Sequence, residues 1–103
     1  MNSNKLSNFN AMIFDELDSA QTKHPKFCDR LCESGGWSMV EKHYKEYNDN
    51  CKEYLGYMLF LEEFSEALNA YDHGDKQHCL QELAQCGAVI LRMMEFVDKE
   101  TKA

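Results

Sequence analysis

Hydrophobic residues recur along most of the chain at spacings of three and four, which is the pattern of amphipathic helices. No alternating strand pattern and no Asn-Gly or Asp-Gly hairpin signal interrupts it. The stretches with this pattern are residues 7–22, 37–71 and 76–99. The sequence therefore predicts an all-α fold.

The first helix is expected to begin at Ser7 or Asn8, either of which can cap it, after a flexible tail over residues 1–6. It is expected to stop near Thr22, because the residue before Pro25 is pushed out of the helical region. A loop follows, up to the stripe of aromatic and apolar residues that begins at Trp37.

Three weak helix formers, Asn48–Asn50, interrupt this stripe. They are either a turn between two helices or a weak point in one long helix, and we favour a break or kink. The next helix is expected over 51–71 and the last over 76–99, joined by the turn Asp72–Asp75. So short a connection predicts an antiparallel hairpin.

Both hairpin helices carry apolar residues on two sides, so each helix must pack against other elements on both of these sides. A second subunit can supply it in a chain of 103 residues, for which we expect a single domain over 1–103. The expected architecture is a helical bundle built on the hairpin and completed by oligomerisation. The alternative source of cover is the segment 37–47 folding back within one chain.

Composition narrows the class of partner. Eleven basic against eighteen acidic residues give a net charge of −7, which disfavours nonspecific binding to nucleic acid or to anionic membranes. No apolar run is long enough to span a bilayer. The five cysteines follow a polar segment, Met1–Asn10, without the apolar core of a signal peptide, so we expect reduced thiols in a cytoplasmic protein.

The main chemical candidate is a set of acids on the two arms of the hairpin. Glu62, Glu63 and Glu66 fall within one sector of a helix, and Glu82 and Gln85 follow on the other arm. Taken alone, such a string is usually a solvated acidic face. Here the acids lie in rows of helix positions that are otherwise apolar and typical of a core. Carboxylates are also ligands that Mg²⁺ prefers.

These residues resemble a known signature. The segment 61–70, LEEFSEALNA, followed by Glu82-Leu83-Ala84-Gln85, is similar to the EExxE…ExxD pattern of MazG-type all-α nucleoside triphosphate pyrophosphohydrolases. DELDSAQTKHPKF at 15–27 and QELAQCGAVILRMMEF at 81–96 resemble a small MazG-like branch. The resemblance covers about residues 13–97.

The resemblance implies a homodimer or homotetramer that hydrolyses nucleoside triphosphates to a monophosphate and pyrophosphate with Mg²⁺ or Mn²⁺. By position, Glu62, Glu63, Glu66 and Glu82 match the motif's glutamates. Gln85 stands where the motif has aspartate. An amide oxygen can coordinate a cation but brings no charge and cannot act as a base.

We expect Glu62 and Glu63 to be catalytic, because a glutamate not fully used in coordination can orient or deprotonate water. All five residues are candidate metal ligands. Arg92 and Lys99 are candidates for holding phosphates, and Trp37 for stacking on the base. The rival hypothesis is a non-catalytic bundle of the same fold that serves protein association.

A zinc site at His24, Cys28 and Cys32 is disfavoured, because the Cys-x3-Cys spacing is not the usual one and no second pair follows.

Overall fold

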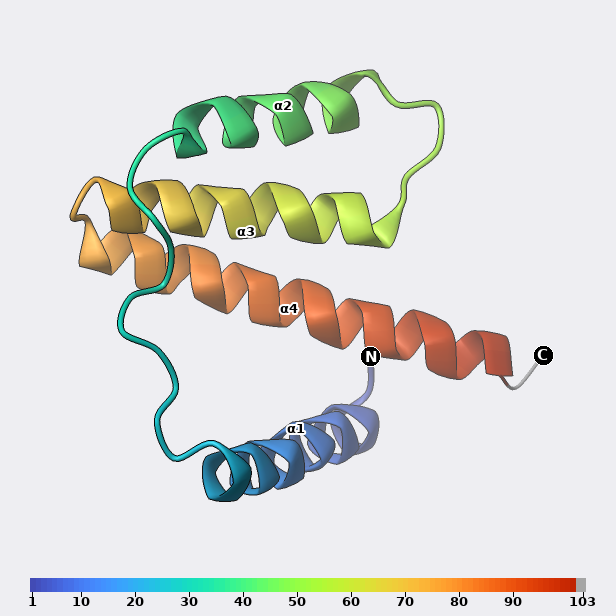
Figure 1. The fold of residues 1–103 in the computed structure, drawn as a ribbon. Helices are drawn as coiled ribbons and strands as arrows, with labels where there is room; N and C mark the ends of the chain where they lie inside the picture. Colours follow the sequence, from blue (N-terminus) through green and yellow to red (C-terminus); the bar gives the residue numbers. More distant parts are fainter. Residues whose placement is uncertain (102–103) are drawn as a thin grey trace. The chain divides into compact units, whose positions relative to one another are not determined.

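The computed structural model describes residues 1–101, and in this range the chain forms helices and no strand, which confirms the all-α prediction (Figure 1). The last two residues of the predicted domain 1–103 lie outside the described residues. The helices are α1 (Ser3–Lys23), α2 (Trp37–Asn50), α3 (Gly56–Asp72) and α4 (Lys76–Thr101).

The chain forms two compact units. The central unit is Arg30–Ile90 and contains α2, α3 and the first part of α4. The terminal unit joins Met1–Asp29, which carries α1, with the last part of α4 from Leu91 onward. The candidate acids belong to the central unit.

In the central unit α3 and the first part of α4 form the predicted hairpin, with α2 beside α3 (Figure 1). Gly74 turns the chain with φ 78°, a left-handed conformation that favours glycine, and the Asp75 carboxylate caps α4 by accepting from the His78 amide. Small buried side chains line the contact between the helices and let them approach closely. They are Ala67, Ala70 and Cys79, with Tyr71 and Leu83 packed against them.

The connection between α2 and α3 is longer than the sequence predicted. The break after the Asn48–Asn50 triplet is confirmed, but α3 begins at Gly56 and not near Cys51. Side-chain amides bond to backbone carbonyls where α2 ends: Asn50 Nδ2 donates to the Glu46 carbonyl at 2.8 Å, and Asn48 Nδ2 donates to the Met58 carbonyl at 3.0 Å.

Contacts with α3 hold the loop residue Gly35 and the first turn of α2 in place. The Gly35 amide donates to Asp72 Oδ2 at 3.0 Å, and the Ser38 hydroxyl lies 3.1 Å from Asn69 Oδ1. Gly35 and Gly36 have φ of 90° and 85°, so a side chain at either position would strain this entry into α2.

In the terminal unit α1 begins four residues before the expected Ser7. The Asn2 side chain accepts from the Lys5 amide at 2.9 Å and supplies the cap, so residues 3–6 are helical and the expected flexible tail is wrong for them. Ion pairs tie this end to α4, from the Met1 amino group to Glu95 and from Lys5 to Asp98. The end of α1 at Lys23 agrees with the prediction from Pro25.

The two-sided apolar pattern is buried only in part. On α3 the buried residues include Met58 and Leu68, whereas Tyr57, Leu59 and Phe64 stay exposed. On α4 Leu80 is exposed by 65%. Of the helices that the structure describes, none combines the length and apolar character needed to cross a membrane.

Candidate functional site

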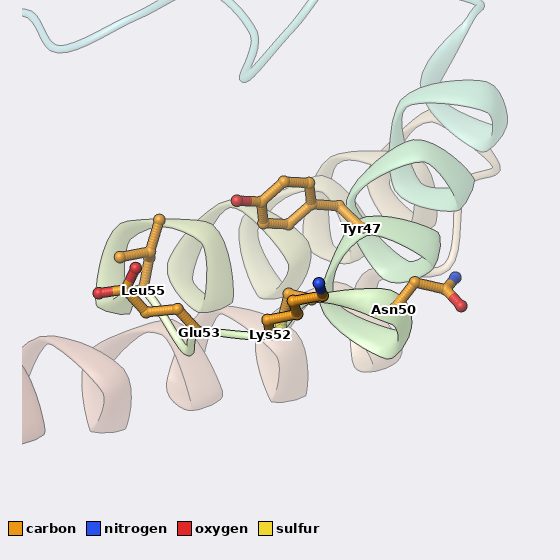
Figure 2. Close-up of a pocket in the computed structure, with 6 residues that line it drawn as sticks. Tyr47, Asn50, Lys52, Glu53 and Leu55 are labelled. Carbon is orange, nitrogen blue, oxygen red and sulfur yellow. The ribbon is translucent and has the colours of Figure 1, made fainter.

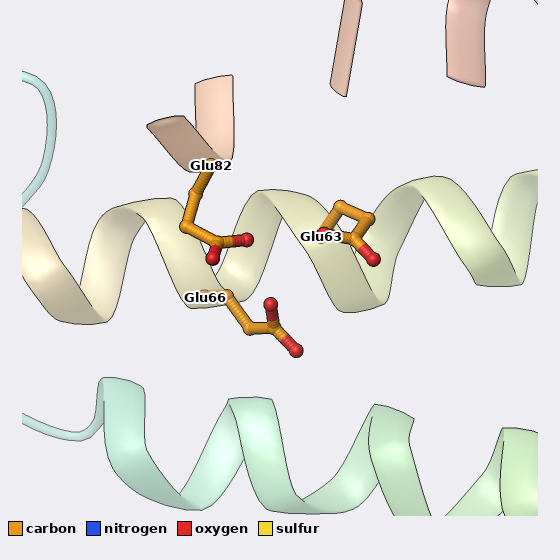
Figure 3. Close-up of side chains that lie close together, drawn as sticks. All are labelled: Glu63, Glu66 and Glu82. Carbon is orange, nitrogen blue, oxygen red and sulfur yellow. The ribbon is translucent and has the colours of Figure 1, made fainter. Parts of the chain in front are cut away.

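Three carboxylates meet between the arms of the hairpin. Glu63 and Glu66 lie one turn apart on α3, and Glu82 reaches them from α4 (Figure 3). One ligand oxygen of each lies within 4.8 Å of the others, so the three side chains could share one cation. We call these three residues the acidic centre. Glu82 is buried, with 7% of its surface exposed, while Glu63 and Glu66 are half-buried.

The acidic centre is electrostatically unfavourable without a cation. Burial, hydrogen bonding to Glu82 and the charges of Glu63, Glu82 and Glu41 raise the pKa of Glu66 to about 8. Burial, hydrogen bonding to Glu82 and the charges of Glu82 and Glu62 also raise the pKa of Glu63. The centre therefore retains a proton at neutral pH, which a divalent cation would displace.

Two polar groups on α4 face the acids. His78 Nε2 lies 3.1 Å from Glu82 Oε1 and donates when it carries the proton. With the Gln85 amide nitrogen turned inward, it donates to Glu63 Oε2 at 2.6 Å and to Glu82 Oε2 at 3.3 Å. Within residues 1–101, no lysine or arginine forms a salt bridge with the acidic centre.

Gln85 thus has a role that the motif's aspartate cannot fill. Its NH₂ group cross-links two carboxylates of the cation-free centre, and a rotation of the amide would present its oxygen to a cation instead. The buried Cys86 thiol lies close by and is neutral: burial and the charges of Glu63 and Glu82 raise its pKa to about 11.

Glu62 lies outside the acidic centre, although the sequence groups it with Glu63 and Glu66. Its carboxylate accepts from Asn48 Nδ2 at 2.9 Å, and the same amide donates to the Met58 carbonyl. These two hydrogen bonds from the Asn48 amide hold Glu62 towards α2. Its carboxylate is therefore not one of the oxygens that Glu63, Glu66 and Glu82 bring together.

A further carboxylate comes from α2. Glu41 accepts from Asn69 Nδ2 at 2.7 Å, and the Ser38 hydroxyl beside Asn69 Oδ1 fixes the orientation of that amide. The sequence did not single out Glu41 or Asn69, and it marked Asn48 only as a weak helix former. Glu41 and Asn48 are seven residues apart and so share one face of α2, which is the only signal that could have linked them.

The predicted substrate-binding residues are not brought to the acidic centre by any described contact. The Trp37 indole donates to the Glu33 carbonyl at 2.9 Å at the start of α2. Arg92 and Lys99 belong to the terminal unit, where Lys99 pairs with Glu95 at 3.9 Å. Their roles stay predictions.

The disfavoured zinc site finds no support in the geometry. In the part of the chain that the structure describes, the acidic centre is the one group of three or more such side chains close enough to hold an ion, and it includes no cysteine or histidine. All five cysteines are free. Burial raises the pKa of the Cys32 thiol.

An open pocket of about 310 Å³ lies at the connection between α2 and α3 (Figure 2). It is lined by Tyr47, Asn50, Cys51, Lys52, Glu53 and Leu55. The Tyr47 ring extends from α2 towards Leu55, the residue that precedes α3 (Figure 2). The pocket therefore lies at the N-terminal end of α3, about two helical turns before Glu62.

Comparisons of the chain with protein-family models, with curated proteins and with solved structures find no match. The candidate site therefore stands on its own geometry and on the resemblance of its motif.

Proposed function

We propose that the protein is a magnesium-dependent nucleotide pyrophosphohydrolase that converts a nucleoside triphosphate to the monophosphate and pyrophosphate. The observation that carries this proposal is the convergence of Glu63, Glu66 and Glu82 from two helices, with oxygens within 4.8 Å. The MazG-like motif suggests the reaction class, and the three convergent carboxylates could hold the cation that this class needs.

The donor set fits a hard divalent cation. It consists of carboxylate oxygens, it lacks sulfur and imidazole, and its negative charge has no lysine or arginine partner among the described residues. When bound, Mg²⁺ or Mn²⁺ would neutralise phosphate charge and favour ionisation of a coordinated water. Glu63, Glu66 and Glu82 would hold the ion, with the Gln85 amide oxygen as a neutral ligand.

Glu62 suits the second catalytic role. It is adjacent to the acidic centre in sequence, is not part of the oxygen cluster, and is oriented by Asn48. A carboxylate so placed can orient the attacking water and accept its proton. Attack at the α-phosphorus would break its bond to the bridging oxygen, and pyrophosphate would leave.

The test is release of pyrophosphate, and not of orthophosphate, from the common nucleoside triphosphates with Mg²⁺ or Mn²⁺. We expect Glu82→Gln to lower the rate at least about a hundredfold, because it removes a buried charged ligand. Glu16→Gln makes the same charge change on an exposed position of α1 and should leave the rate unchanged. Absence of pyrophosphate from every triphosphate, or full activity of Glu82→Gln, would contradict the proposal.

The second candidate is a non-catalytic bundle that serves protein association. The exposed apolar row of α1, which includes Ile13, Phe14 and Leu17 at helical spacings of three and four, favours it. The same row is compatible with the enzyme as a homodimer or homotetramer. Pyrophosphate release, therefore, separates the two candidates, whereas oligomeric state does not.

A further inference from the structure

The open pocket between α2 and α3 has no part in the chemistry proposed above. Its lining combines an aromatic ring, an aliphatic side chain and two opposite charges, from Tyr47, Leu55, Lys52 and Glu53. Tyr47 is 41% exposed and its ring extends over the connection (Figure 2). A planar ligand with apolar faces and a polar edge matches this combination.

One face of α2 connects this pocket with the acidic centre. Glu41 and Asn48 are seven residues apart, so they share one face of α2, and Cys51 follows as the extended residue that ends the helix. At the first position Glu41 adds its charge to Glu66, at the second Asn48 donates to Glu62, and at the third Cys51 lines the pocket.

The distance along this face suits a nucleotide. From Glu62 back to Leu55 is two helical turns, roughly 10 Å at 1.5 Å per residue. An extended nucleotide can cover this path with its base at one end and its phosphates at the other. Glu62 and Asn48 would then lie near the middle, where the sugar and the α-phosphate meet.

We propose that this pocket binds the base of the nucleotide whose phosphates the acidic centre takes, an inference that rests on the proposed function. Tyr47 stacks on the base, as aromatic side chains do in single-strand recognition, and Leu55 contacts its edge. The Glu53 carboxylate accepts from an amino group and the Lys52 ammonium donates to a carbonyl. Cytosine and guanine carry both groups, so these bases are preferred over uracil and thymine.

The experiment measures binding of the monophosphates CMP and UMP to the magnesium-loaded protein by calorimetry. CMP is expected to bind more tightly than UMP. Tyr47→Ala should weaken CMP binding about tenfold, and Tyr47→Phe, which keeps the ring, should restore it. Tyr54→Ala is the matched control, since Tyr54 is 79% exposed in the same connection and does not line the pocket.

Glu53→Gln tests the base preference. It should reduce the ratio of CMP to UMP affinity, because the amide can donate as well as accept. Equal effects of Tyr47→Ala and Tyr54→Ala, or no binding of either monophosphate by the wild type, would overturn the inference. Unchanged melting temperatures of the variants show that each remains folded.

The two proposals fail differently. Pyrophosphate release with the same Michaelis constant in Tyr47→Ala and the wild type would overturn the base pocket and leave the enzyme standing. Tyr47-dependent CMP binding without any pyrophosphate release would overturn the hydrolase and leave a nucleotide-binding protein.

Discussion

Helices α1 and α3 are both amphipathic, yet they differ in what they bury. α3 has 17 residues and buries five of them, Met58, Ser65, Ala67, Leu68 and Ala70. α1 has 21 residues and buries only Phe9, while Phe14 on the same helix is 62% exposed. An apolar face is buried only where another surface is available. α3 finds such surfaces in α2 and α4, and α1 leaves most of its own face open.

The comparison extends to polar groups. The central unit holds acids among its half-buried and buried side chains, and amides from Asn48, Asn69 and Gln85 contact several of them. The terminal unit instead has partly buried ion pairs, Lys5 with Asp98 and the Met1 amino group with Glu95. The central unit thus carries the candidate chemistry, and the terminal unit carries the candidate association surface.

The largest expected effect is on assembly. We expect the wild type to sediment as a multiple of its 12.0 kDa mass and Phe14→Asp to sediment as a monomer, because a charge on this exposed apolar row opposes burial. Asn8→Asp adds the same charge to an exposed polar position of α1 and should change nothing. A wild type that sediments at 12.0 kDa would show that the row has no second copy as its partner.

The next effect concerns the acidic centre and pH. Because the pKa of Glu66 is raised from 4.5 to about 8, the folded state binds more protons than the unfolded state between these values. Stability without metal should therefore fall as pH rises from about 5 to above 8, by on the order of 5 °C in melting temperature. Scanning calorimetry in the presence of a chelator measures this slope.

Two comparisons sharpen that result. Glu66→Gln should flatten the slope and raise the melting temperature at high pH, since it removes the charge that must be buried. Millimolar Mg²⁺ should raise the wild-type melting temperature at pH 8 by mass action and leave Glu66→Gln unshifted. A wild-type curve independent of both pH and Mg²⁺ would mean that the acids are simply solvated.

Gln85→Asp should act in opposite directions with and without metal. It removes the amide donor 2.6 Å from Glu63 and adds a fourth carboxylate, so the metal-free protein should lose about 1–2 kcal/mol of stability. With Mn²⁺ the added charge should tighten binding and enlarge the stabilisation. Gln81→Asp, at an exposed position of the same helix, is the control. Weaker Mn²⁺ binding in Gln85→Asp would instead indicate a centre adapted to the neutral amide.

The smallest effect is expected at the edge of the centre. Asn48→Ala removes the bonds to Glu62 and to the Met58 carbonyl and should cost about 1 kcal/mol in urea unfolding. Asn8→Ala, on the exposed surface of α1, should cost much less. Equal effects would show that the amide contributes no more to stability than a surface side chain.

Helix content, the Pro25 stop and the turn at Gly74 could be predicted from the sequence because they depend on neighbours within a few residues. The start of α1 differs from the prediction because Asn2 supplies the cap, five positions before the stretch 7–22 in which the helical spacing is recognisable. The start of α3 differs from the prediction because Cys51 and Leu55 adopt extended backbone, so the residues between the two helices form a connection.

The sequence by itself determined that Glu62, Glu63 and Glu66 share a helix face and that Glu82 lies on the opposite arm of a hairpin. It could not determine which of them meet, because that depends on how closely Ala67, Ala70 and Cys79 let the two helices approach. Tertiary structure placed Glu63, Glu66 and Glu82 together, turned Glu62 to Asn48 and added Glu41 from a third helix. The type of each side chain and its place on a helix face follow from the sequence alone. The raised pKa of Glu66 does not, because it arises only when separate segments bring like charges into a partly buried space.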